Sequence, residues 1–353
     1  MRRALELARQ AWGQTHPNPM VGAVITEQGQ VVAEGYHAKA GQPHAEVMAL
    51  RALGRRPSPE AILHVTLEPC CTHGRTPPCV EAIIQAGIRT VVVGAKDPNP
   101  QHTGRGIDLL RAQGIQVIEG VLAEECTQLN LIFNHWIVEQ RPLVALKIAS
   151  TMDGKLVLPA EQGKQITSEA SRADVHQLRK LFPAIAVSAA TVLADNPRLT
   201  ARTSQGESCG VRFVLDRQFR TAGQKGLHVF QDAFASQTIV VGLAEKLRAA
   251  DRAWYEAEGI KVWELPGGVE DFWSAWLQRA AKQNLTGILL EAGPRLAATV
   301  LAEHLVDYLY VYFAPRLSGL AEEPVWWSDV LATWQGRSQV CGSDLRVDGF
   351  WPG

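Results

Sequence analysis

Long apolar segments are absent from this sequence of 353 residues. No run of apolar residues reaches the roughly 20 that a helix needs to span a bilayer. The chain opens with Met1 to Arg3 and a short apolar stretch, like a secretory signal, but Arg9, Gln10 and Trp12 follow before an apolar core develops. We therefore expect an amphipathic N-terminal helix, no membrane partner and a cytoplasmic location.

An excess of positive charge is also absent. Lysine and arginine number 35 against 36 aspartate and glutamate residues, which gives a formal net charge of −1. Proteins that bind a nucleic-acid backbone usually carry an excess or a stripe of basic residues, so the net charge argues against such a partner. The net charge does not exclude a local basic patch. The length is sufficient for two soluble domains with separate cores.

Cysteines are too few and too unevenly spaced for a disulfide framework. Six are present, and three of them fall within a ten-residue segment, a crowding that suggests a metal site. The isolated ones are expected to be free thiols that pack as small hydrophobic side chains. The crowded cysteines are Cys70, Cys71 and Cys79, and the isolated ones are Cys126, Cys209 and Cys341.

Helical and strand patterns alternate along the whole chain, which is typical of α/β domains with largely parallel sheets. In the first half we predict helices at 3–12, 45–53, 80–86, 106–113 and 123–138, and strands at 20–26, 31–34, 61–67, 90–94 and 116–119. In the second half we predict helices at 270–282 and 294–303, and strands at 143–149, 185–188, 212–216, 238–242, 287–291 and 307–314. The pattern breaks at residues 140–142, so we expect domains at 1–141 and 142–353.

The strongest chemical signal is His44-Ala45-Glu46, followed by Glu68-Pro69-Cys70 and Pro77-Pro78-Cys79. A hydrolytic zinc takes three protein ligands and keeps one position for water. A carboxylate that is near but not bound can carry the proton of that water to a departing amine. Zinc deaminases of nucleobases use this grouping, so we predict zinc ligands at His44, Cys70 and Cys79, with Glu46 as the catalytic proton carrier.

Local geometry agrees with this assignment. Residues two apart lie on nearly opposite sides of a helix, so His44 and Glu46 share a metal only if the helix meets it end-on, with His44 in the preceding turn. Cys79 is expected in the first turn of a helix, where the dipole favours a thiolate. Cys71 is a competing ligand, and we prefer Cys70 because it follows Glu68-Pro69. Surface residues and structural cysteines are the alternative to a metal site, and the combined order of all three motifs disfavours it.

These residues resemble the bifunctional riboflavin-biosynthesis deaminase/reductase family, over nearly the whole chain. The resemblance in the first half is carried by residues 15–19 (THPNP), 21–22, 41–46, 74–79 (GRTPPC) and 96–100 (KDPNP). Eight residues separate Cys70 from Cys79, whereas two usually intervene in cytidine and tRNA deaminases. The family has a histidine where Thr72 stands, so either His73 replaces it or one substrate contact is lost.

For the first half, the resemblance implies a cytidine-deaminase-like α/β/α domain. It would be a zinc hydrolase acting on a cyclic amidine, which removes the 2-amino group of 2,5-diamino-6-(5-phosphoribosylamino)pyrimidin-4(3H)-one. Base, ribose or phosphate would be contacted by Asn18, His37, Arg75 and Asn99. Amide and guanidinium groups suit these contacts, although Asn18 between two prolines also fits a simple turn.

The second half lacks the G-x-G-x-x-G of a Rossmann fold. Its best unaided feature is the strand 288–291 running into Ala292-Gly293-Pro294 and a helix, a junction that can hold a phosphate. The family resemblance continues through residues 147–154, 166–168, 191–200, 291–293 and the strand from Asp307.

The resemblance implies a dihydrofolate-reductase-like α/β domain that uses NADPH to reduce the ribosyl group to ribityl phosphate. NADPH would be held by Ala149, Thr191, Asp195, Gly293, Pro294, Arg295, Leu296, Ala297, Ala298 and Thr299. Substrate would be contacted by Arg179, Leu199, Arg202 and Glu291. For the catalytic proton donor we consider Asp195 first and Lys147 second, although Asp195 before Asn196-Pro197 also fits a turn. The family often has a tryptophan where Gln165 stands.

We therefore expect a bifunctional enzyme with zinc and NADPH as cofactors, a pyrimidine ribotide as substrate and a homo-oligomeric state. One alternative is a zinc deaminase of another nucleobase or of a nucleic acid. That class favours a short Cys-x-x-Cys and a basic face, neither of which the sequence shows. The other alternative is a second half that serves only for dimerisation, which NADPH binding would exclude.

Overall fold

The computed structural model describes residues 1–72, 77–163, 165–319, 334 and 336–351. The chain forms two compact units, Met1–Gln140 and Arg141–Gly353, and each is described by itself. Across the described ranges, no helix combines the length and apolar character that a membrane crossing requires.

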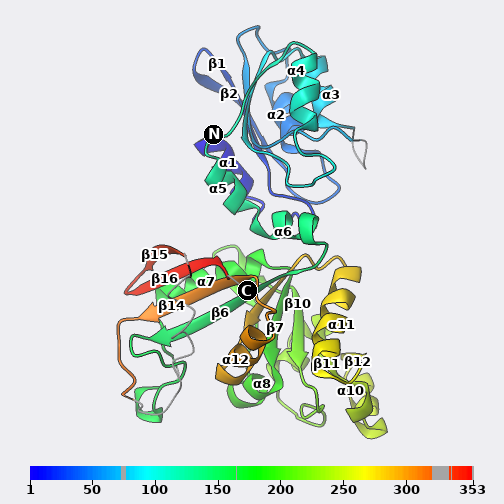
Figure 1. Ribbon diagram of the computed structural model, residues 1–353, viewed down its shortest axis with the longest axis vertical. Coiled ribbons are helices and arrows are strands. Elements are labelled where there is room, and N and C mark those ends of the chain that lie inside the picture. Colours follow the sequence, from blue (N-terminus) through cyan, green and yellow to red (C-terminus); the bar gives the residue numbers. More distant parts are fainter. Residues whose placement is uncertain (73–76, 164, 320–333, 335, 352–353) are drawn as a thin grey trace. The chain divides into compact units, whose positions relative to one another are not determined.

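The N-terminal unit is a five-stranded sheet between two helical layers (Figure 1). Its strand order is β2-β1-β3-β4-β5, with antiparallel pairs among β2, β1 and β3 and parallel pairs among β3, β4 and β5. Its strands are β1 (Gly22–Glu27), β2 (Gln30–Tyr36), β3 (Ile62–Leu67), β4 (Thr90–Ala95) and β5 (Gln116–Ile118). Its helices are α1 (Arg2–Arg9), α2 (Ala45–Leu53), α3 (Cys79–Ala86), α4 (Arg105–Ala112), α5 (Ala123–Leu129) and α6 (Leu131–Glu139).

Close packing of α1 and α2 on opposite faces of this sheet depends on two glycines. A Cβ on Gly22 would clash with the backbone of Ala4 in α1, and one on Gly35 would clash with the backbone of α2. The face under α2, α3 and α4 buries the larger core, which includes Ile25, Leu63 and Ile83. This face matters for function because the turns that begin α2, α3 and α4 carry candidate site residues.

Two expectations for the first half are wrong. The sheet expected to be largely parallel is only half parallel: the strand pair β1–β2, which the turn at Gln28-Gly29 predicts, is antiparallel, and β1 also pairs antiparallel with β3. The single helix predicted at 123–138 is broken at Asn130, whose side chain exchanges hydrogen bonds of 2.8 and 2.9 Å with the backbone of Met20. Those bonds come from a residue 110 positions away, so helical periodicity cannot reveal them.

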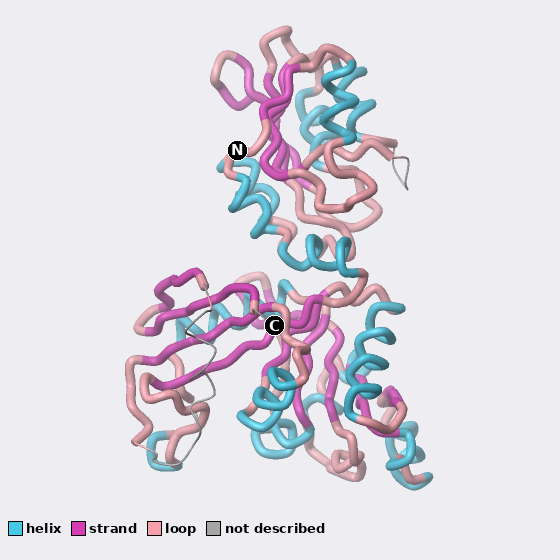
Figure 2. The backbone as a smooth tube through the Cα atoms, viewed as in Figure 1, coloured by secondary structure: helices cyan, strands magenta, loops and turns pink. Residues whose placement is uncertain are grey.

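The C-terminal unit is built on a nine-stranded sheet of order β12-β11-β10-β7-β13-β6-β14-β16-β15. Figure 2 shows strands and the helices that pack around them. All neighbours from β12 to β14 are parallel, and β16 and β15 add an antiparallel edge. The strands are β6 (Leu143–Thr151), β7 (Ala184–Ser188), β10 (Val211–Leu215), β11 (Thr238–Leu243), β12 (Lys261–Leu265), β13 (Gly287–Glu291), β14 (Tyr308–Ala314), β15 (Arg337–Cys341) and β16 (Asp344–Phe350). A separate antiparallel pair is β8 (Ala201–Thr203) with β9 (Gly206–Ser208).

The α-helices of this unit are α7 (Glu169–Leu181), α8 (Ala189–Asp195), α9 (His228–Gln231), α10 (Ala249–Ala257), α11 (Val269–Lys282) and α12 (Pro294–Ala302). Three short 3-10 turns are η1 (Ala160–Gln162), η2 (Ala235–Gln237) and η3 (Ala244–Lys246). One face of the sheet buries α11 and α12 through residues such as Phe272, Trp276 and Val300. On the other face α7 contacts the sheet: Phe182, which caps it, packs edge-on against Tyr310, and Asp174 accepts a hydrogen bond from Tyr312. Sequence periodicity did not predict α7, which carries Arg179.

Candidate functional site

Three candidate metal ligands converge at one end of the N-terminal sheet. His44 caps α2 in an extended conformation, Cys70 follows β3, and Cys79 is the first residue of α3. His44 Nδ1 lies 3.5 Å from Cys70 Sγ and 3.3 Å from Cys79 Sγ. The three ligand atoms all lie within 4.8 Å of one another, close enough to share one ion.

The chemistry of this cluster fits zinc. Hydrogen bonds from the Cys79 thiol, from His44 and from the Cys79 backbone N–H lower the pKa of Cys70 to about 4, although burial opposes them. A second thiolate beside the first is disfavoured, so the pKa of Cys79 is raised. A cation between the two sulfurs would offset this repulsion and favour the thiolate form of both. One imidazole nitrogen and two sulfurs are donors that zinc accepts in a tetrahedral catalytic site.

Glu46 lies beside these ligands and is 3% exposed. It is the second residue of α2, and it interacts with both Cys70 and Cys79. Burial, and then the negative charge of Cys70, raises the pKa of Glu46 to about 7. The carboxylate is therefore placed near the ligands without belonging to the three-atom cluster.

Asn18 and His37 are joined to the same cluster. The His37 ring packs edge-on against His44 with centroids 5.2 Å apart, and its Nδ1–H donates to the carbonyl of Pro43 at 3.2 Å. This bond leaves Nε2 as the acceptor for the Asn18 amide at 3.3 Å. Burial lowers the pKa of His37, which favours this neutral form. The two residues thus form an ordered polar wall next to the ligands.

Of the two remaining predicted substrate contacts in the first half, Asn99 and Arg75, the structure describes only Asn99. Asn99 lies in the loop between β4 and α4, where its side-chain oxygen accepts from the Gln101 N–H at 3.0 Å. Arg75, as well as His73, lies outside the described residues. Cys71 is partly buried, and burial raises its pKa, which makes it a poorer thiolate than Cys70.

In the C-terminal unit, Arg179 and Glu291 form a buried ion pair. Arg179 Nε and Nη2 donate to the two oxygens of Glu291 at 2.6 and 2.8 Å, and each side chain is 14% exposed. Burial raises the pKa of Glu291, but the charge and hydrogen bonds of Arg179 outweigh it and lower the pKa to about 2. Lys147 is in register with Glu291 on the neighbouring strand, and burial lowers its pKa.

Arg202 lies beside the same helix, α7, where it contacts His176. Arg179 Nη1 donates to the Thr200 carbonyl at 3.1 Å, and Arg202 Nη1 donates to the Thr200 hydroxyl at 2.9 Å. Leu199 is buried. His176, which the sequence analysis missed, accepts from Arg202 at 3.3 Å and lies three residues before Arg179, hence on the same face of the helix. That spacing was the available signal.

The predicted cofactor residues lie at the carboxyl ends of β7, β13 and β6. Gly293 caps α12 without a side-chain hydrogen bond, and a Cβ placed on it would meet Thr191 Oγ1 at 3.7 Å, so the starts of α8 and α12 are neighbours. Thr191 itself is held by Ser188 at 3.2 Å. Ala149 is in register with Tyr312. These strand ends are where open α/β sheets bind dinucleotides, and unpartnered N–H groups at a helix start suit a phosphate.

Not all of the run from Gly293 to Thr299 faces one way. Pro294, Arg295 and Ala298 are exposed and Leu296 is half-buried, whereas the Ala297 side chain is wholly buried in the core. Thr299 donates to the Arg295 carbonyl at 2.9 Å. Asp195 is the exposed last residue of α8. Of the two proton-donor candidates, Lys147 rather than Asp195 therefore lies within the buried Arg179–Glu291 cluster.

Comparison with known proteins identifies both halves. Residues 1–95 match the family described as cytidine and deoxycytidylate deaminase zinc-binding region, and residues 142–344 match the RibD C-terminal domain. The riboflavin biosynthesis protein RibD of Actinobacillus pleuropneumoniae is 41% identical over 319 residues, which cover 90% of this chain and 84% of the relative. The corresponding protein of Aquifex aeolicus is 40% identical over 90% of this chain and 87% of its own. The chain belongs to the RibD family.

A solved structure agrees with this membership. The diaminohydroxyphosphoribosylaminopyrimidine deaminase/5-amino-6-(5-phosphoribosylamino)uracil reductase of Thermotoga maritima superposes with a TM-score of 0.83 at 34% identity, covering 100% of this chain and 97% of its own. The expected fold class, a cytidine-deaminase-like domain followed by a dihydrofolate-reductase-like α/β domain, is confirmed, and the second domain matches the RibD C-terminal domain. So is the expectation of a bifunctional deaminase and reductase of riboflavin biosynthesis that uses zinc and NADPH.

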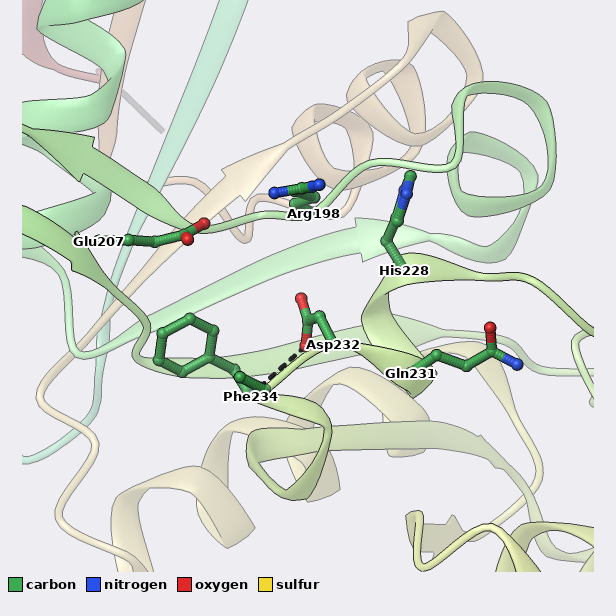
Figure 3. A pocket seen from close by; sticks show the side chains of 7 residues that line it. Arg198, Glu207, His228, Gln231, Asp232 and Phe234 are labelled. Carbon is green, nitrogen blue, oxygen red and sulfur yellow. Dashed lines mark hydrogen bonds between the residues drawn. The ribbon is translucent and has the colours of Figure 1, made fainter.

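A separate polar pocket of about 330 Å³ lies in the reductase unit of this RibD-family chain (Figure 3). Arg198, His228, Gln231 and Asp232 line it, together with Glu207, Ala233 and Phe234. Asp232 accepts hydrogen bonds of 2.6 and 2.8 Å from the buried Arg212, so the charge of its carboxylate is already paired. Among the residues that the structure describes, no predicted substrate or cofactor residue lines this pocket, so the pocket does not support the assignment of the reductase site.

Proposed function

We propose that the N-terminal unit deaminates 2,5-diamino-6-(5-phosphoribosylamino)pyrimidin-4(3H)-one and that the C-terminal unit reduces the ribosyl group of the product to ribityl phosphate. The observation that carries the first reaction is the convergence of His44, Cys70 and Cys79 within 4.8 Å, with Glu46 buried beside them. The second reaction is supported by the polar cluster of Arg179, Glu291 and Arg202 next to a helix start suited to a phosphate.

In the deaminase, His44, Cys70 and Cys79 would hold zinc. Zinc supplies, when bound, a water that is acidic enough to act as hydroxide near neutral pH. Glu46 accepts the proton of that water and delivers it to the departing 2-amino group. The Asn18 amide and His37, locked as a neutral ring, orient the pyrimidine, and Asn99 and Arg75 complete the contacts to base, ribose or phosphate.

In the reductase, Gly293 and the first turn of α12 would hold a phosphate of NADPH, with Ala149, Thr191 and Asp195 around the rest of the cofactor. NADPH supplies the hydride, so the protein needs only to align it with C1′ of the sugar and exclude water. Arg202, which is exposed, would bind the substrate phosphate. For the proton we favour Lys147 over Asp195, because Lys147 is partly buried in register with Glu291, whereas Asp195 is exposed.

The partner is a small molecule, the pyrimidine ribotide. A homo-oligomeric state and a cytoplasmic location stay predictions from the sequence. Size-exclusion chromatography with light scattering measures the former.

The test uses the intact chain, the diamino-pyrimidinone ribotide, and mass spectrometry with and without NADPH. Without NADPH we expect the deaminated ribotide alone, and with NADPH its ribityl product. The Glu46→Gln variant should leave the ribotide unchanged and still reduce ribotide that has been deaminated beforehand. Absence of the deaminated product with zinc-loaded wild-type protein would overturn the proposal.

A further inference from the structure

A second buried glutamate lies two residues before the zinc ligand Cys70, and the mechanism above does not use it. Glu68 follows β3, and it is 5% exposed. Its Oε2 accepts hydrogen bonds from the backbone N–H groups of Asp97 at 3.1 Å and Gly104 at 3.0 Å. Its Oε1 accepts from the N–H groups of Gly106 at 2.9 Å and Ile107 at 3.4 Å.

The Glu68 carboxylate caps the helix α4 and also closes the loop 97–104 that precedes it. Oε1 occupies the N-terminus of α4, where the first N–H groups have no partner within the helix and where the cap residue, Gly104, makes no side-chain bond. Oε2 ties Asp97 to Gly104, so a single oxygen atom closes both ends of the loop 97–104.

Asn99 lies inside the loop that Glu68 closes. The Asn99 N–H donates to Asp97 Oδ1 at 2.9 Å, and its carbonyl accepts from the N–H groups of His102 and Thr103 at 2.8 and 2.9 Å. The Thr103 hydroxyl donates to the carbonyls of Asp97 and Asn99 at 2.5 and 2.9 Å. The loop is thus internally rigid, and its placement as a body depends on Glu68.

We propose that Glu68 is a positioning residue for deamination: it fixes the substrate contact Asn99 relative to the zinc ligand Cys70. The inference rests on the proposed function, because it assumes that Asn99 contacts the ribotide. The physical link is short, since the same backbone that carries Cys70 carries the carboxylate that closes the Asn99 loop. Charge-assisted bonds to a carboxylate are stronger than neutral ones, which suits a group that must hold four donors at once.

The lack of a side chain at Gly106 allows the start of α4 to approach Pro69 and Glu68 closely. A Cβ at this position would clash with the carbonyl oxygen of Pro69 and lie 3.3 Å from Glu68 Oε1. Alanine there has no conformational problem within the helix, so its effect would come from pushing α4 and the loop away from Glu68. The Gly106→Ala variant therefore perturbs the placement of the loop without removing the carboxylate.

The experiment measures KM and kcat of deamination and zinc content for Glu68→Gln, Asn99→Ala and the double variant. The exposed Glu60→Gln serves as a control matched for the loss of one charge, and reduction of pre-deaminated ribotide monitors the folding of the chain. Loss of one neutral hydrogen bond to the substrate corresponds to a rise in KM of about three- to ten-fold for Asn99→Ala. For Glu68→Gln we expect KM to rise by no more than it does in Asn99→Ala. Its kcat should stay within about two-fold of the wild-type value, and its zinc content should be unchanged.

The double variant decides the matter, because residues that act through one another are not additive. Its KM should equal that of Asn99→Ala alone, and Gly106→Ala should raise KM as Glu68→Gln does. Multiplied effects in the double variant, loss of zinc in Glu68→Gln, or a wild-type KM in Gly106→Ala would each overturn the inference. A wild-type chain that does not deaminate, or an Asn99→Ala variant with unchanged KM, would instead show that the proposed function fails first.

Discussion

Removal of the Glu291 carboxylate from the reductase unit should have a large and measurable effect on stability. In the Glu291→Gln variant, Arg179 loses a bidentate partner at 2.6 and 2.8 Å, and the buried Lys147 loses its nearest favourable charge. Breaking a buried pair from one side typically costs about 3–5 kcal/mol. We expect about 2–3 kcal/mol, because glutamine still accepts one hydrogen bond and each side chain keeps 14% exposure.

Tryptophan fluorescence in a urea titration measures this effect in the appropriate unit, because eight of the ten tryptophans, all except Trp12 and Trp136, belong to residues 141–353. Deaminase activity and zinc content of the same variant report on the other unit and should stay at wild-type values. The double variant Arg179→Gln with Glu291→Gln should recover part of the loss, since no uncompensated arginine then remains buried.

The same pair predicts a pH dependence of defined sign. The pKa of Glu291 is lowered from its ordinary 4.5 to about 2, so its contribution is complete above about pH 4.5 and is lost as the pH falls toward 2. The difference between wild type and Glu291→Gln should therefore be constant near neutral pH and shrink below about pH 4.5. An unchanged urea midpoint at pH 7, or a difference that grows in acid, would refute this account of the ion pair.

Three further predictions concern the deaminase. The Glu46→Gln variant should keep zinc and reductase activity but lose deamination by about 10²–10⁴-fold, the usual contribution of a positioned proton carrier, as measured by ammonia release. Dialysis against a chelator should abolish deamination and spare the reduction of pre-deaminated ribotide, and added Zn²⁺ should restore it; deamination that survives metal removal would contradict the zinc site. Cys70→Ser should lower bound zinc, whereas Cys71→Ser should leave zinc and turnover near wild type; the reverse result would exchange the two ligands.

The zinc cluster was the part of the molecule most open to prediction from the sequence. Each ligand belongs to a short motif with its own physical reason, such as the helix start at Cys79 that favours a thiolate. The structure places His44 in the turn before α2, as expected, and brings the three candidate ligand atoms within 4.8 Å of one another. Rules for helix starts and short motifs were sufficient to predict these ligands, because residues close in sequence form each of the turns that carry them.

Contacts between distant segments were beyond such rules. The break at Asn130 depends on bonds to Met20, and the pairing of Arg179 with Glu291 joins residues 112 positions apart. Arg179 and Glu291 were predicted as substrate contacts only through the family resemblance, and no role was predicted for Glu68 beyond its place in the motif before Cys70. The charges of a buried network become meaningful only when the fold shows which donors each one faces.

Both candidate sites follow from one property of parallel sheets. The carboxyl ends of neighbouring parallel strands meet at the same edge, so residues that follow them come together however far apart they are in the sequence. In the first unit β3 leads to Glu68 and Cys70 while its parallel neighbour β4 leads to the Asn99 loop. In the second unit β13 ends at Glu291 while its parallel neighbour β7 leads to Thr191. Because the parallel pair of β3 and β4 places these segments side by side without joining them, a side-chain contact sets their final distance, and Glu68 makes it through its bonds to Asp97 and Gly104.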